Sequence, residues 1–229
     1  MSNMLETVEE LLVDVAKETP NVYNAGYGKG LIDGANNSSG DDYLKKFWGV
    51  RQNYGKATNY TYAFYGSSWI DEIYDPQHDF MVNSNVNSMF YGAYITDTKK
   101  PIDISGSNVK SNTNSIFQNS KIKRIEMLRL KEDGSNSLTK CFDGCNELEE
   151  INLEGKIGKS VSFVDCGNLK VESIINILTH LMDYTGSSTT YTLTLHDDCK
   201  TLMETQGEVE VLGGKTYDRY ISDIGWTLA

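Results

Sequence analysis

A short pattern of apolar positions returns four times between residues 88 and 169. Each copy has a phenylalanine, a small side chain three residues later, and an Ile or Leu soon after it. The phenylalanines are Phe90, Phe117, Phe142 and Phe163, and the small residues are Ala93, Ser120, Cys145 and Cys166. The copies lie 27, 25 and 21 residues apart. We therefore expect a solenoid, in which each unit buries its apolar face against its neighbours. In the two middle copies, the phrases 125–130 and 148–153 predict a β-strand after the turn.

The N-terminal segment has the spacing of an amphipathic helix over residues 4–18, and Pro20 ends it. Its apolar positions are Leu5, Val8, Leu12 and Val15. The same alternation of three and four residues fits a coiled-coil seam for oligomerisation and a helix packed on its own domain, and the pattern leaves both open. About two heptads are too short to hold an oligomer without further contacts.

The rest of the chain predicts caps on either side of the repeats. Residues 21–40 are polar and rich in glycine, as in a linker, and a helix over 41–52 and a strand over 58–65 follow. After the repeats we expect a helix over 171–184, a strand over 191–195, a weaker helix from Asp198, a turn at Gly213–Gly214, helix over 215–223 and a last strand at 226–228. The predicted fold is α/β: an irregular β solenoid with helical caps. Its divisions are an N-terminal helix (1–20), a linker and cap (21–85), and the repeats with a C-terminal cap (86–229).

Composition narrows the classes of partner. The net charge of −11 argues against nucleic acid, and we interpret the basic run Lys121–Arg124 as a solvated edge of the repeat. No stretch approaches the roughly 18 apolar residues of a membrane span, and the first residues lack the features of a signal peptide. Because Cys145 and Cys166 occupy equivalent repeat positions, we expect them to pack as small apolar residues rather than to form a disulfide.

Motifs for catalysis are missing from the sequence. It contains no GxSxG, HExxH or Walker-type loop. The run His196–Cys199 carries ligand-type atoms at consecutive positions, and we interpret it as a strand end leading into a helix N-cap rather than as a metal site. Asp71, Glu72 and Asp75 are interpreted as turn acids. We therefore expect no enzyme activity, no cofactor and no metal.

Aromatic residues are the stronger candidates for a binding surface, because tyrosine and tryptophan offer a large contact area and keep a polar group. They crowd before and at the first repeat, and the candidates are Tyr60, Tyr62, Tyr65, Trp69, Tyr91 and Tyr94. The alternative is that part of this set points inward and builds the N-terminal cap.

Several of these phrases carry a resemblance. The segment 142–153, Phe-Asp-Gly-Cys-Asn-Glu-Leu-Glu-Glu-Ile-Asn-Leu, resembles the BspA-like leucine-rich repeats of bacterial surface proteins. The order of motifs along nearly the whole chain is also similar to small proteins of bacteriophages and prophages of gut Firmicutes. The motifs are the acidic first helix, Val22-Tyr23-Asn24-Ala25-Gly26, Phe47-Trp48, the strand 59–64 with Gly66 and Trp69, and the terminal Trp-Thr-Leu.

The resemblance implies adhesion or assembly without catalysis. We expect a virion protein associated with the tail or baseplate, assembled in the host cytoplasm, that binds other virion proteins and a host surface protein or glycan. The N-terminal helix would attach or oligomerise it, with a trimer as the expected state. The alternatives are a bacterial surface adhesin or interaction scaffold, and a capsid decoration or head-fibre protein. As given, the chain shows neither an export signal nor an anchor, which favours the virion.

Overall fold

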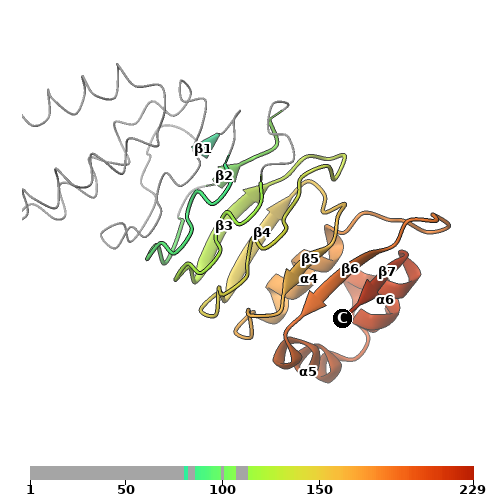
Figure 1. Cartoon of the computed structure of the whole chain (residues 1–229). Coiled ribbons are helices and arrows are strands. Elements are labelled where there is room, and N and C mark those ends of the chain that lie inside the picture. Colours follow the sequence, from blue (N-terminus) through green and yellow to red (C-terminus); the bar gives the residue numbers. More distant parts are fainter. Residues whose placement is uncertain (1–79, 82–85, 99–100, 107–112) are drawn as a thin grey trace, which may run out of the picture.

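The computed structural model describes residues 80–81, 86–98, 101–106 and 113–229. The helices expected over 4–18 and 41–52 and the strand expected over 58–65 lie outside this part of the chain. Its strands form two small sheets, each parallel throughout, in the order β1-β2-β3-β4 and β5-β6-β7 (Figure 1). The first sheet contains β1 (Phe80–Met81), β2 (Pro101–Asp103), β3 (Arg124–Arg129) and β4 (Glu150–Glu154). The second contains β5 (Val161–Phe163), β6 (Tyr191–Leu195) and β7 (Trp226–Leu228). The expected mixed α/β class is confirmed.

Three turns with one backbone geometry precede the strands β2, β3 and β4. Each turn has two residues with positive φ, four positions apart, on either side of its phenylalanine, and these pairs are Ser88 and Gly92, Ser115 and Asn119, and Lys140 and Gly144. Successive turns are hydrogen-bonded to each other: the amide of Phe90 donates to the carbonyl of Ile116 (2.8 Å), and that of Phe117 donates to the carbonyl of Cys141 (3.1 Å). The three copies of the sequence pattern are therefore equivalent in structure and stack in register.

The four phenylalanines form a continuous column inside this stack. Neighbouring rings lie 5.5, 6.1 and 4.6 Å apart between centroids and are nearly parallel. All four side chains are at most 1% exposed, and the small residues beside them are equally buried. Cys145 and Cys166 are two of these small residues, and both are free, buried thiols. The expectation that they pack instead of forming a disulfide is confirmed.

The fourth copy departs from the other three. Phe163 lies in the strand β5, and no residue of this copy has positive φ. After it comes the helix α4 (Val171–Thr179), which packs on β4. Its side chains take the place of a fifth strand at the edge of the first sheet: Ser173 Oγ accepts the amide of Ile151 (3.0 Å), and Asn176 Oδ1 accepts the amide of Leu153 (2.8 Å).

The helix expected over 171–184 ends five residues early, so that boundary is wrong. His180 is the C-cap of α4, and its ring is hydrogen-bonded to the carbonyl of Asn176 (2.7 Å). Leu181 then forms a parallel bridge with Ile157 in place of another helical turn. Helical periodicity continues through this segment, but pairing with a distant residue decides its conformation.

The C-terminal third agrees closely with the sequence. The strands expected at 191–195 and 226–228 are β6 and β7, and the weaker helix is α5 (Asp197–Gln206). A short 3-10 turn, η3 (Glu210–Leu212), precedes Gly213 and Gly214, and the last helix is α6 (Tyr217–Asp223). A single core runs from Val86 to Trp226 and includes side chains of both sheets.

Candidate functional site

The outward face of the strands β3 and β4 carries charged side chains in rows. Ile125 and Leu128 of β3, and Ile151 and Leu153 of β4, are buried, whereas the residues between them are half-buried or exposed. Between the pairs Ile125–Ile151 and Leu128–Leu153 the register shifts, so that two residues of β3 oppose one residue of β4. This β-bulge leaves both residues half-buried, and bulges of this kind commonly redirect side chains near sites of function.

The bulge residues are Glu126 and Met127, and buried polar groups hold their backbone. The amide of Glu126 donates to the hydroxyl of Thr98, which is completely buried (2.9 Å). On the other side, Asn152 Nδ2 donates to the carbonyl of Glu126 (2.9 Å). The backbone of the bulge is therefore held from both neighbouring chain segments.

Arg124 is the centre of the charges around the bulge. Its guanidinium contacts the carboxylates of Asp97 (3.4 Å) and Glu150 (3.1 Å), and also that of Glu126. Partial burial lowers the pKa of Arg124, but the carboxylates of Asp97 and Glu126 outweigh it and raise the pKa overall. Hydrogen bonds from Lys170 and Arg124 lower the pKa of Glu150. Both shifts favour the charged forms of Arg124 and Glu150.

A second row of charge borders an open hollow at the carboxyl ends of β3 and β4. Arg129 Nε pairs with Glu154 Oε2 at 2.9 Å. The hollow measures about 660 Å³, and its lining is Ser105, Glu154 and the segment 129–133. Hydrogen bonds from the hydroxyl and the amide of Ser135 lower the pKa of Asp133, which suits a turn acid and not a proton donor.

Of the aromatic residues predicted to form a binding surface, the structure describes Tyr91 and Tyr94, which lie at the first turn. Tyr94 is 52% exposed, as a binding residue requires. Tyr91 is half-buried, and its hydroxyl accepts a hydrogen bond from Asn119 Nδ2 of the next turn (2.9 Å), so it also holds two turns together. The other proposed contact residues, Tyr60, Tyr62, Tyr65 and Trp69, lie outside the described residues, as do the oligomerisation positions Leu5, Val8, Leu12 and Val15.

Two carboxylates meet on the same side of the stack. Asp165 Oδ2 accepts the amide of Gly144 (2.7 Å). Burial and the neighbouring carboxylate of Asp165 raise the pKa of Asp143. Sequence analysis did not single out this pair, because the two residues belong to different repeats.

The His196–Cys199 run has the structure expected for it. His196 is the N-cap of α5, and its Nδ1 accepts the amide of Asp198 (3.1 Å). Cys199 is buried and donates to the carbonyl of Cys166 (3.2 Å). Burial raises the pKa of the four thiols, that of Cys145 to about 11. Within the described ranges, no group of three or more His, Cys, Asp or Glu side chains is placed to hold a metal ion.

The charged face was missed by sequence reasoning, although a signal for it exists. Arg124 and Glu150 lie 26 positions apart, and Arg129 and Glu154 lie 25 apart, which is close to the spacing of the middle repeats. Opposite charges at the repeat distance on outward positions predict cross-strand pairs.

No protein-family model, no curated protein and no solved structure matches this chain. In the part of the chain that the structure covers, no helix combines the length and the apolarity needed to cross a bilayer.

Proposed function

We propose that this chain is a non-catalytic binding module, and that residues 86–229 form a short leucine-rich-repeat-like solenoid closed by helices. Three features support the solenoid: the equivalent turns, the backbone hydrogen bonds between them, and the column of phenylalanine rings. A stack of this kind offers a long, rigid surface, which suits recognition of another macromolecule.

The observation that carries the proposal is the fixed charged face around the Glu126–Met127 bulge. Exposed ion pairs contribute only about 0–1 kcal/mol each to stability, so the pairs of Arg124 and Arg129 do little to hold the fold. Arg124 contacts three carboxylates at once, and such a network restricts these long side chains more than an isolated pair does before a partner arrives. A surface organised in advance loses less side-chain entropy on binding.

The chemistry of this face favours binding over catalysis. General acid–base catalysis needs a group whose pKa lies near the working pH. Here Lys170 and Arg124 hold Glu150 ionised, and the hydrogen bonds from Ser135 do the same for Asp133. Charged groups of both signs with one half-buried methionine suit a polar protein surface or a glycan.

The wider setting in this proposal rests on the resemblance of the sequence to phage and prophage proteins. In that setting the module belongs to a virion, on the tail or baseplate. Residues 1–20 attach or oligomerise it with other virion proteins, and the charged face binds a host protein or glycan. A bacterial surface adhesin with the same binding face is the alternative, and the location of the protein separates the two.

The test combines fractionation with one variant on the face and one control. Particles are purified by density gradient from a culture that makes the protein, and the chain is detected in the particle fraction and on intact cells. We expect it in the particles, and removal of residues 1–20 should release it. Its presence on intact cells, with none in the particles, would support the adhesin instead.

Asn152→Arg places a bulky cation next to the bulge, and Thr227→Arg adds the same side chain at an exposed position of the second sheet. We expect Asn152→Arg to reduce binding of the purified protein to host cells at least tenfold and Thr227→Arg to leave it unchanged. Equal binding by both variants and the unmodified protein would refute the assignment of the charged face.

A further inference from the structure

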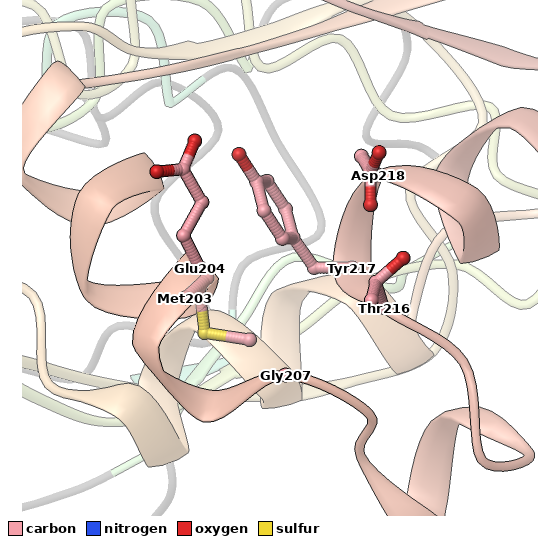
Figure 2. Close-up of a pocket in the computed structure, with 6 residues that line it drawn as sticks. All are labelled: Met203, Glu204, Gly207, Thr216, Tyr217 and Asp218. Atoms are coloured by element: carbon pink, nitrogen blue, oxygen red, sulfur yellow. The ribbon is translucent and has the colours of Figure 1, made fainter.

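The C-terminal cap contains a small hollow between α5 and α6, of about 170 Å³ (Figure 2). It lies apart from the charged face, and the argument for it does not depend on the function proposed above. Its lining residues are Met203, Glu204, Gly207, Thr216, Tyr217 and Asp218. Two carboxylates, one phenol and one thioether are thus gathered around one small space.

Tyr217 gives the hollow its polar centre. Its side chain is only 5% exposed, and Figure 2 shows its hydroxyl pointing toward the side where the Glu204 carboxylate lies, with Asp218 on the opposite side near Thr216. Among the described residues this hydroxyl has no hydrogen-bond partner. The hydroxyl is therefore available to a polar group from outside the chain.

Among the described residues, no Lys or Arg side chain forms an ion pair with either carboxylate, although a hydrogen bond from the Thr216 hydroxyl and the charge of Arg219 lower the pKa of Asp218. In the described part of the chain, Lys200 pairs with Asp197, and Lys215 and Arg219 both pair with Asp223. Residues 171–229 contain nine acidic and only three basic side chains. Glu204 and Asp218 therefore face the hollow without an ion-pair partner from α5, α6 or the segment between them.

The volume of the hollow and the number of its acceptor atoms indicate which ligand fits it. A dry cavity of about 150 Å³ holds a benzene molecule, so this hollow has room for the five non-hydrogen atoms of a lysine side chain beyond Cα. An ammonium group has three donors in a compact head, and the two carboxylates and the phenol oxygen supply three acceptors. Met203 and the Tyr217 ring offer apolar contact and a cation–π surface to the methylenes and the head. Calcium requires six to eight oxygen ligands, which this set does not supply.

We propose that this hollow binds a primary alkylammonium group, as presented by a lysine side chain of a partner protein. A free alkylamine offers the same chemistry, so the experiment includes both forms. Exposed carboxylates bind single cations weakly, and we expect dissociation constants in the millimolar range for small probes, with tighter binding where the lysine belongs to an interface.

The experiment is a titration of the full chain followed by amide NMR signals, with Gly207 and Tyr217 as reporters. The probes are n-butylammonium, Nα-acetyl-lysine N-methylamide, 1-butanol as the neutral analogue, and tetramethylammonium as a cation without N–H donors. We expect saturable shifts with the first two probes and none with the last two. Binding of butylammonium without the blocked lysine would overturn the protein partner and leave a free amine as the ligand.

Three variants locate the binding. Glu204→Gln and Tyr217→Phe each remove one contact, and Glu204 is exposed, so its replacement does not endanger the fold. Glu208→Gln removes the same charge from an exposed position outside the hollow. We expect Glu204→Gln to weaken butylammonium about two- to fivefold and Glu208→Gln to leave it unchanged. No saturable shift with any probe, or equal weakening by the two glutamine variants, would overturn the proposal.

Discussion

Removal of one ring from the phenylalanine column tests the argument for the fold directly. Phe117 is the best position, because its ring lies between those of Phe90 (5.5 Å) and Phe142 (6.1 Å) and its side chain is 1% exposed. Phe→Ala in a packed core costs about 3–5 kcal/mol. Contacts with a ring on each side put Phe117→Ala toward the upper part of this range, since each aromatic pair adds about 0.5–1.5 kcal/mol beyond the buried area.

A second substitution separates ring stacking from volume. Phe117→Leu keeps most of the apolar volume but removes both ring pairs, so we expect a loss of about 1–3 kcal/mol. Unfolding in urea, followed by circular dichroism, measures both losses. For a chain of this length, 1 kcal/mol corresponds to about 2–4 °C in Tm, so Phe117→Ala should lower Tm by roughly 8 °C or more.

Tyr94→Ala is the control, because this side chain lies in the same stack but is 52% exposed. We expect it to change the free energy of unfolding by no more than about 0.5 kcal/mol. If Phe117→Ala costs less than about 1 kcal/mol, or no more than Tyr94→Ala, the column does not hold the turns together and the reasoning fails.

Three further predictions test other contacts. Gly155 has φ +85°, and an added Cβ would overlap the carbonyl oxygen of Leu130, so Gly155→Ala should lower the free energy of unfolding by at least about 2 kcal/mol in urea. Ser173→Ala leaves a buried β4 amide without its acceptor and should cost about 1–3 kcal/mol, with faster hydrogen exchange at that amide as the direct readout. The raised pKa of Asp143 means that its ionisation destabilises the fold, so its contribution is most favourable below the unfolded pKa of about 3.9 and is lost as the pH rises through the higher folded value. Asp143→Asn should therefore stabilise the protein at pH 7 and not at pH 3, whereas an equal effect at both pH values would show that ionisation of Asp143 does not destabilise the fold.

The repeat could be predicted because its physical requirement is local. A unit with one large and one small buried side chain must repeat that pair, and Phe-x-x-small is visible in the sequence before any contact is known. Strands β6 and β7 and helix α5 were predictable for the same reason, since alternation and capping residues determine them locally.

The divergence of the fourth copy was harder to predict. The first three turns begin on Ser88, Ser115 and Lys140, which all have positive φ, whereas the fourth has the β-branched Val161 at the matching place. β-Branched residues favour extended backbone, which agrees with the strand β5. The early end of α4 had no local signal, because it depends on pairing across the fold.

Features of the candidate site could also be predicted only where they depend on neighbouring residues in the sequence. Tyr94 is exposed, so it is accessible as the predicted contact residue. Arg124 looked like one member of a short basic run, and only the stacking of strands brings Asp97, Glu126 and Glu150 around it. Single charges say little about a surface until the register between repeats is known.

The way in which the stack ends explains why two sheets are present instead of one. Each of the first turns satisfies its amides with carbonyls of the next turn, and each strand does the same with its neighbour, so a stack without a different last unit would leave an edge open. Here side chains end both series of backbone hydrogen bonds. Asp165 accepts the amide of Gly144 in the last turn, and Ser173 and Asn176 accept amides of β4 in the last strand. Helix α4 occupies the edge of the first sheet, and the strand β5 before it pairs in a second sheet with β6 and β7 after it. The side chains of the fourth unit therefore set the length of the first sheet and start the second.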